Sequence, residues 1–371
     1  MPAAAIWSYL KNGATRPWQS LTVRMGTLRV ILVLSFVGWN IDGRYVMPVT
    51  GHVALICFYI ISGFTISMVI HENYRHVEKG LWRFYAARFL RVFPIYWTVC
   101  LLTLIFWLVI RGAKPVVFFN LDLPPGIWLP TLIANFAIFG LDALAVAVQT
   151  TWKTTNILQL IPPAWSLAIA LQFYLVAPFI VTRSLRFLIG AFLALLLVRA
   201  AFLGLHHEPW RSYFAPTVWC FFILGVLAHR LIRPRPESAA ELGAVAAVVL
   251  LGAVAITGTS EAKDIDRPEL WLFYLLFAAG IPLIFAWTKR VQWDDEIGQL
   301  AYPLFLVHPL VIVAVARSQE AYRSITELHW SWHVLALLIS IIAAVAIYCL
   351  VGVPTEWLRS RVKRRRSAPG E

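Results

Sequence analysis

The chain has 371 residues, of which 60% are hydrophobic and 14% are charged, and its mean hydropathy is +0.72. A soluble globular domain carries roughly 25% charged residues, so this composition excludes a single water-soluble domain. The net charge of +13 would suggest nucleic acid as a partner of a soluble protein. Here the basic residues lie in short loops and at the C-terminus, which is typical of the cytoplasmic side of a membrane protein. We therefore predict the lipid bilayer, and no nucleic acid, as the partner.

Apolar segments recur along the whole chain, and many approach the roughly 20 residues that cross about 30 Å of hydrocarbon as a helix. Tryptophan and tyrosine cluster near the ends of these segments, as expected at headgroup level. In chain order, the eleven segments are centred on residues 28–40, 52–70, 92–110, 127–147, 164–182, 187–203, 213–231, 239–256, 270–287, 300–316 and 332–351.

Charge in the loops predicts how many segments cross. The basic C-terminal tail and the basic residues 230–235 fit a cytoplasmic side, and the acidic stretch 259–266 fits the opposite side. Eleven crossings would place the basic stretch 71–91 outside, against the positive-inside rule. Segment 127–147, which contains Pro130, Asn135 and Asp142, is the best candidate for the exception, since such residues are tolerated where protein or a cavity covers them.

The predicted fold class is therefore all-α, a polytopic bundle of about ten spanning helices plus one re-entrant or interfacial segment. Residues 1–27 form a cytoplasmic N-terminal segment, residues 28–353 the membrane domain, and residues 354–371 a basic cytoplasmic tail. We expect a bacterial cytoplasmic membrane, with both termini cytoplasmic. The four cysteines are isolated and His206–His207 lacks a third ligand, so we expect neither a disulfide framework nor a metal. The oligomeric state is not indicated by the sequence.

Polar residues within the apolar segments are candidates for function, because they are costly there. Arg29 and Asn40 are eleven residues apart, close to three helical turns, so they share a helix face about 16 Å apart along the axis. Arg88 and Arg91 share a face at the entry of a later helix, and arginine forks match phosphate oxygens. Each of these residues has an alternative without a role in function. Arg29 could extend its charged end to the membrane surface, and Arg88 and Arg91 could fix the orientation of their helix in the membrane. Asn40 could simply end its helix.

Two later segments hold further candidates. In residues 164–182, Ser166, Ala170 and Phe173 or Tyr174 fall on one helix face, and no acidic residue lies in this helix. In the segment from Tyr302, His308 has an ordinary pKa suited to proton transfer, although a neutral histidine bonded to another helix is equally open. Ser62 and Gly63 mark a point where another helix or a ligand chain could approach closely.

Taken together, these residues resemble the acyltransferase 3 family of membrane O-acyltransferases, which modify polysaccharides, lipids and antibiotics. The matching elements follow the family's order over nearly the whole chain. They are Leu28–Arg29; residues 58–64 with Ser62 and Gly63; Arg88 and Arg91 with Pro94, Tyr96 and Trp97; Trp165, Ser166 and Leu167 with Gln172, Phe173 and Tyr174; and Tyr302 with His308.

The resemblance implies a mechanism. An acyl-CoA, most often acetyl-CoA, binds from the cytoplasmic side with its phosphates held by arginines such as Arg88 and Arg91, and Arg29 opens the first helix. A first-helix histidine acts as general base or acyl relay, and a glutamate in the later Trp-Ser-Leu helix supports it. The acceptor is a hydroxyl of a glycan, lipid-linked sugar or secondary metabolite on the far side of the membrane.

This sequence departs from the family at both catalytic positions, because Asn40 stands where the histidine is expected and Ala170 where the glutamate is expected. Asparagine cannot take up and release a proton near pH 7, and a positioned base contributes typically about 10²–10⁴-fold. Three hypotheses remain: an acyltransferase with His308 as base and Asn40 as donor to an oxyanion, a catalytically inactive relative that binds or regulates, and a small-molecule transporter. Against the transporter, the apolar segments lack carboxylates suited to ion coupling.

Overall fold

The computed structural model describes residues 25–42, 48–74, 79–109, 125–152, 159–204, 208–232, 239–257, 264–288, 291–322 and 331–364. Over these ranges every regular element is a helix, which confirms the predicted all-α class. The elements are α2 (Gly26–Asp42), α3 (Gly51–Val69), η1 (Ile70–Tyr74), α4 (Gly80–Val109), α5 (Pro125–Ala137), α6 (Leu141–Trp152), α7 (Ala164–Ile180), α8 (Leu185–Gly204), α9 (Glu208–Tyr213), α10 (Ala215–Leu231), α11 (Ala239–Thr257), α12 (Pro268–Thr288), α13 (Gln292–Gly298), α14 (Ala301–Tyr322), α15 (Ser331–Ile347), η2 (Tyr348–Gly352) and α16 (Val353–Arg364).

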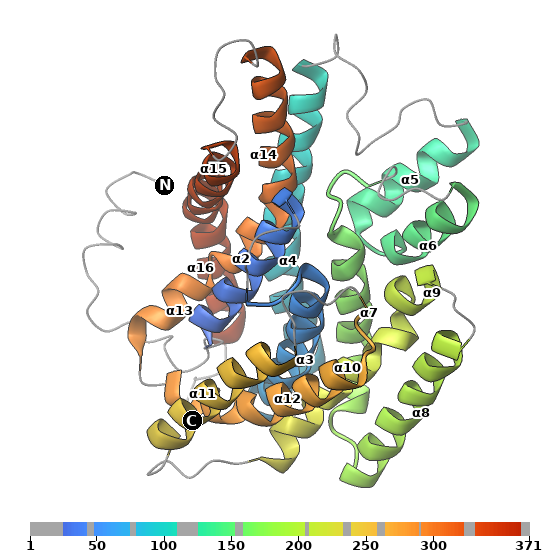
Figure 1. Ribbon diagram of the computed structural model, residues 1–371, viewed down its shortest axis with the longest axis vertical. Helices are drawn as coiled ribbons and strands as arrows, with labels where there is room; N and C mark the ends of the chain where they lie inside the picture. Colours follow the sequence, from blue (N-terminus) through green and yellow to red (C-terminus); the bar gives the residue numbers. More distant parts are fainter. Residues whose placement is uncertain are drawn as a thin grey trace, which may run out of the picture.

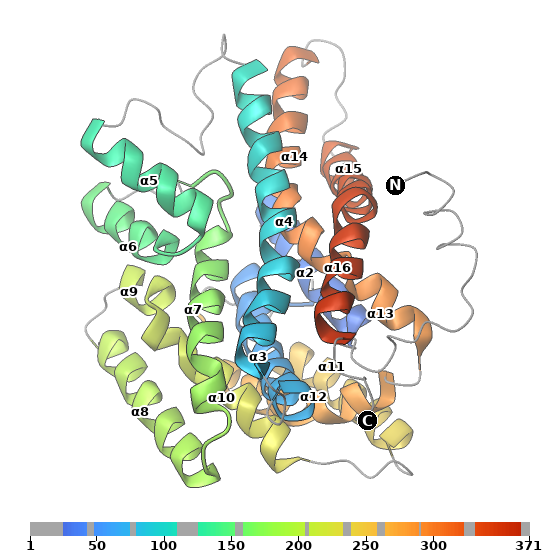
Figure 2. The ribbon, with the colours of Figure 1, turned by 180° about the vertical axis from the view of Figure 1, so that it is seen from behind.

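Helix length and composition identify six helical stretches in the described ranges as candidates to cross a membrane, and five shorter apolar helices accompany them. The six include η1 with α3, and η2 and most of α16 with α15. Each predicted apolar segment except 127–147 coincides with one long helix. The protein is thus built as an integral membrane protein, while the number of about ten crossings stays a prediction. In Figures 1 and 2, α4 and α14 run side by side, and α5 and α6 lie to the side, beyond α7.

Helix α3 is the central element, and most of its residues are buried. It meets α10 at two glycines. A Cβ built on Gly63 would come within 1.9 Å of the Phe222 carbonyl oxygen, and one on Gly225 within 1.9 Å of the Ile60 carbonyl oxygen. The two backbones therefore touch, as small residues allow inside membranes. The sequence indicated that another helix or a ligand chain could approach closely at Ser62 and Gly63. At Gly63 it is another helix, α10, that does so.

The apolar segment 127–147 is broken into α5 and α6 at Ile138 and Gly140, which have φ values of 69° and 86°. With 13 and 12 residues, these helices rise only about 20 and 18 Å, too short to cross about 30 Å of hydrocarbon. Side chains of α4 satisfy the carbonyls at the break: the Tyr96 hydroxyl donates to Asn135 O and the Trp97 indole to Phe136 O. Such pairing is what a broken helix at membrane depth requires.

The helices that precede and follow α5 and α6 run in opposite directions. The Tyr85 hydroxyl, near the start of α4, donates to Leu175 O near the end of α7. Helices α4 and α7 run in opposite directions in Figures 1 and 2, so the chain enters α5 and leaves α6 near the same end of these two helices. That residues 127–147 do not cross the membrane stays a prediction. At the same end of the molecule, Arg230 of α10 donates to Val181 O and interacts with His71 of η1. The ends of α3, α7 and α10 that carry basic residues thus lie together, while their cytoplasmic placement stays a prediction.

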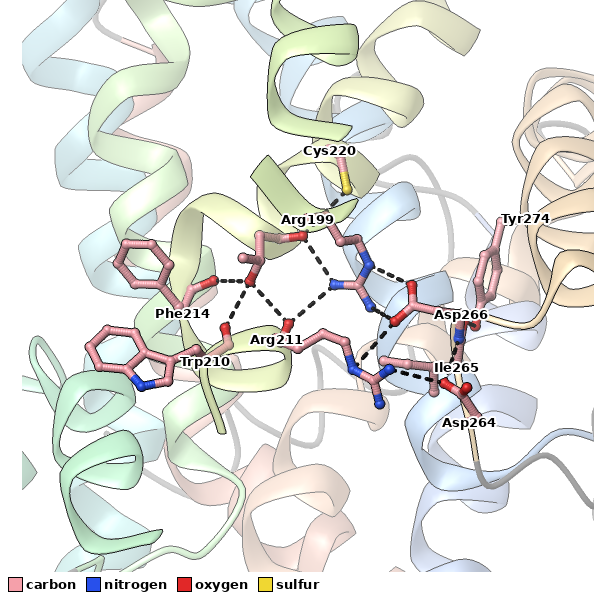
Figure 3. Close-up of polar contacts among 10 residues, drawn as sticks. Arg199, Trp210, Arg211, Phe214, Cys220, Asp264, Ile265, Asp266 and Tyr274 are labelled. Carbon is pink, nitrogen blue, oxygen red and sulfur yellow. Dashed lines mark hydrogen bonds and ion pairs between the residues drawn. The ribbon is translucent and has the colours of Figure 1, made fainter. Parts of the chain in front are cut away.

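A buried ion pair joins α8 to the segment before α12 (Figure 3). The guanidinium of Arg199 binds the Asp266 carboxylate through two hydrogen bonds, at 2.6 and 2.9 Å, and both side chains are 2% exposed. The remaining guanidinium nitrogen donates to the carbonyls of Arg211 and Thr217. Each arginine nitrogen has a partner, which such a buried charge requires. The network fastens α8, α9, α10 and α12 to one another.

The predicted tail from residue 354 begins as a helix. Residues Val353–Arg364 form α16, which packs against α4. Residues 1–24 and 365–371 lie outside the described ranges.

The glycine contact between α3 and α10 gives a first prediction. Gly63→Ala should destabilise the protein by about 1–3 kcal/mol, because overpacking forces the two backbones apart. A Cβ on Gly190 of α8 meets no atom within 4 Å, so Gly190→Ala is the matched control and should not lower the Tm. Thermal unfolding of the detergent-purified protein measures both. Equal Tm values for the two variants would contradict the close contact.

The ion pair in Figure 3 gives a second prediction. Arg199→Met should lower the free energy of unfolding by about 3–5 kcal/mol, because it leaves the Asp266 charge buried without its main partner. Arg267 forms an exposed ion pair with Glu269, with side chains 42% and 54% exposed. Arg267→Met should therefore cost at most about 1 kcal/mol. Denaturant unfolding measures the free energy of unfolding of both variants. If Arg199→Met loses no more than Arg267→Met, the buried ion pair does not have the predicted stabilising role.

Candidate functional site

A cavity of about 170 Å³ lies between α2, α3, α4, α7 and α14 and brings together most of the polar residues that the sequence predicts for a site. Its floor and walls are otherwise apolar and aromatic. The polar or predicted residues among its lining are Arg29, Tyr59, Ser62, Thr65, Arg88, Arg91, Ser166, Ala170, Tyr174 and Tyr302. Five elements far apart in the sequence therefore meet at one small space.

Arg29 enters the cavity from the first turn of α2. Its guanidinium donates to the Thr65 hydroxyl of α3 at 3.2 Å, and the side chain is buried. The start of α2 is held by Asp294 of α13, whose carboxylate accepts hydrogen bonds from the backbone nitrogens of Gly26 and Thr27 and from the Thr27 hydroxyl. A carboxylate suits a helix N-terminus. This cap fixes the register of α2 and with it the position of Arg29.

Arg88 and Arg91 enter the same cavity from α4, as their shared helix face predicts. The Arg88 guanidinium lies over the rings of Phe84 and Tyr174, at 5.5 and 5.8 Å from their centroids. Within the described residues, no carboxylate lies within ion-pair distance of Arg29, Arg88 or Arg91. The three charges interact electrostatically with one another, and Asp295 of α13 partly compensates Arg29 from beyond ion-pair distance.

Helix α7 supplies the opposite wall. Ser166, Ala170 and Tyr174 line the cavity, as expected for one face. Phe173 instead stacks on Phe222 of α10, with ring centroids 4.5 Å apart. The Ser166 hydroxyl donates to Pro163 O within its own helical turn. This wall thus offers a hydroxyl and an aromatic ring, with only a methyl group at position 170.

The other predicted residues of α7 point away from the cavity. The Trp165 ring packs against Tyr213 of α9, with centroids 4.3 Å apart. The Gln172 amide donates to the Asp142 carboxylate of α6 at 2.8 Å. These contacts fasten α7 to the short helices beside it and are structural.

Helix α14 contributes Tyr302, whose hydroxyl donates to Val92 O of α4 at 2.9 Å. His308, two turns further on, is buried but does not line the cavity. Its Nδ1 is 3.2 Å from Leu304 O, and its ring contacts those of Phe36 and Phe305. Phe305 does line the cavity, so the imidazole contacts a residue of the cavity wall without lining the cavity itself.

Asn40 also lies apart from the cavity. Its side chain is exposed, and its amide donates to Phe36 O within α2. The structure therefore brings together Arg29, Arg88 and Arg91 but separates them from Asn40, the residue paired with Arg29 by spacing. Ser62 lines the cavity, whereas Gly63 faces α10.

Sequence reasoning gave no structural role to two acidic residues that matter here. Asp294 caps α2, and Asp142, 5% exposed, holds Gln172. The Asp142 Oδ1 is buried with no hydrogen-bond partner in the part of the chain described. Asp142 was noted only as a sign that segment 127–147 does not cross, and Asp294 stands in a short acidic run before an apolar segment; the partner of each lies on another helix.

Chemically, the cavity combines fixed positive charge with an apolar lining. Guanidinium groups bind phosphate or carboxylate oxygens, and the aromatic and aliphatic walls suit an uncharged group. Among the described lining residues there is no histidine, cysteine or carboxylate, so none is a proton acceptor near neutral pH. No three metal-ligating side chains group together in the described ranges, and His206–His207 lies outside them.

This is a helical membrane protein with an arginine-lined cavity between its helices. The family model described as an acyltransferase domain, of acyltransferase 3, matches residues 27–350. Because the match covers most of the chain, the protein belongs to this family. Neither the curated proteins nor the solved structures contain a match to the chain.

Proposed function

We propose that the protein is a membrane acyltransferase that binds acyl-CoA through Arg29, Arg88 and Arg91. It transfers the acyl group to a hydroxyl of a glycan, a lipid-linked sugar or a secondary metabolite. The observation that carries this proposal is the meeting of three guanidinium groups at one cavity, with no carboxylate of the described residues paired to them. Like charges repel, so an anionic ligand would stabilise this arrangement.

The apolar part of the lining supports a thioester-bound acyl group beside the anion. Val92 of α4 lies beside the arginines, and Phe58 of α3 and Phe305 of α14 line the same cavity. The cavity volume of about 170 Å³ is below the range of about 300–1,000 Å³ that encloses whole drug-sized ligands. It therefore suits one end of an acyl-CoA, and a short acyl group such as acetyl is the donor we propose.

The transfer needs a group that takes the proton of the acceptor hydroxyl. If the protein is active, this group is His308, which contacts Phe305 of the cavity lining but does not line the cavity itself. Transfer then needs a rearrangement that brings the imidazole to the cavity. Tyr302, with its hydroxyl on Val92 O, holds α14 against α4 beside that point.

A second candidate function is binding or regulation without transfer. It is favoured by the position of Asn40, exposed and bonded to its own helix, and by the methyl group of Ala170 where the family has an acid. In this case the cavity would bind acyl-CoA, and no acyl group would leave it.

Binding is tested first. Arg88→Ala combined with Arg91→Ala should weaken CoA binding about 10–100-fold or more, because each hydrogen bond to a charged group is worth about 1.5–3 kcal/mol. The matched control is Arg183→Ala with Arg186→Ala, an exposed pair with the same spacing, which should leave the Kd unchanged. Calorimetry in detergent measures both. An unchanged Kd in the Arg88/Arg91 variant would favour topological anchoring.

Catalysis is tested by acyl transfer and thioester hydrolysis with the purified protein. For an active enzyme, His308→Ala should lower the rate about 10²–10⁴-fold, while His333→Ala on α15 serves as the histidine control. Undiminished activity in His308→Ala would exclude this base. The inactive alternative expects no turnover in the natural protein and a gain of activity in Asn40→His with Ala170→Glu.

A further inference from the structure

Among the residues of α16 whose burial is described, Arg359 is a deeply buried arginine. Arg359 is 4% exposed, although it lies in a basic segment that sequence reasoning placed in a tail. Its guanidinium binds the Glu356 carboxylate, three residues earlier on the same helix, at 2.6 Å. Since α16 packs against α4, this side chain is directed into the protein and not into solvent.

Arg359 lies near two of the cavity's arginines without lining the cavity itself. Arg359 interacts electrostatically with both Arg88 and Arg91 of α4. In the described part of the chain, Glu356 is the only carboxylate in an ion pair with any of these three arginines. Three positive charges and one negative charge therefore meet between α4 and α16.

Two nitrogens in this group are buried without a hydrogen-bond partner among the described residues. They are the Nε atoms of Arg88 and of Arg359. A buried donor without an acceptor costs free energy, more so on a charged group. Both donors and the excess positive charge would be satisfied by an anion with several oxygens, and the planar guanidinium fork fits phosphate oxygens in pairs.

We propose that Arg359, together with Arg88 and Arg91, forms a subsite for a phosphate group, which α16 closes from the predicted cytoplasmic side. Glu356 holds Arg359 in position through the ion pair. The phosphate comes either from the terminal phosphomonoester of CoA, an identification that rests on the proposed function, or from a lipid headgroup. A phosphomonoester carries about −1.5 to −2 charges near pH 7, which would balance the excess of the three arginines.

Nucleotide binding to the full-length protein in nanodiscs separates these sources. With discs of phosphatidylcholine, CoA should bind at least about tenfold more tightly than 3′-dephospho-CoA. Arg359→Gln should weaken CoA about tenfold and leave the Kd of 3′-dephospho-CoA unchanged, so that the preference disappears. The control Arg186→Gln, an exposed arginine at the same predicted end, should keep the preference.

A second arm uses the lipid. If the phosphate is a headgroup, phosphatidate in the discs should raise the Tm of the natural protein but not that of Arg359→Gln, and the CoA preference should be absent. Arg359→Lys keeps the positive charge but removes the paired guanidinium donors. A folded Arg359→Lys variant should therefore retain part of the CoA preference or of the phosphatidate effect, whichever the natural protein shows.

Three outcomes decide the matter. Failure of CoA binding together with a phosphatidate effect that depends on Arg359 would refute the proposed function and leave the phosphate subsite in place. Equal weakening of CoA and 3′-dephospho-CoA by Arg359→Gln would overturn the subsite while sparing acyl-CoA binding. Absence of both the CoA preference and the phosphatidate effect would also overturn the subsite.

Discussion

The direct contact between the backbones of α3 and α10 is the constraint on which the rest of the bundle depends. Gly63 and Gly225 each leave room for a carbonyl oxygen of the other helix, so α3 lies deep enough to be surrounded by α2, α7, α10 and α12. Thr65, half a turn beyond Gly63, then faces Arg29. The glycine contact on one face of α3 thus places a cavity wall on the other.

A second constraint is that every polar backbone group in hydrocarbon needs a partner. The break between α5 and α6 is possible because Tyr96 and Trp97 of α4 donate to its carbonyls and because Asn135 Oδ1 accepts from the Leu160 nitrogen. Those bonds anchor α5 to α4, about one helical turn after Arg91 and Val92 of the cavity wall, and to the segment before α7. The irregular segment and the cavity are therefore parts of one packing arrangement.

Much of the fold could be predicted from the sequence, because apolar length and loop charge act locally. Spacing predicted that Arg88 and Arg91 share one helix face and that Ser166 and Ala170 share another, and the four residues line one cavity. What failed was inference along a single helix: Asn40 shares a face with Arg29 by spacing but is exposed. The direction of Arg359 could not be predicted either, because it depends on how α16 packs against α4, and no local pattern encodes this.

The cavity separates two requirements of acyl transfer. Holding a charged donor needs fixed guanidinium groups, and these are present on α2 and α4. Moving a proton needs a titratable group, and His308 contacts Phe305 of the lining without lining the cavity itself. Binding can therefore proceed in the observed arrangement, whereas transfer by His308 requires α14 or its aromatic side chains to rearrange. If the protein is an enzyme that uses this base, such a rearrangement would couple occupancy of the cavity to the chemistry.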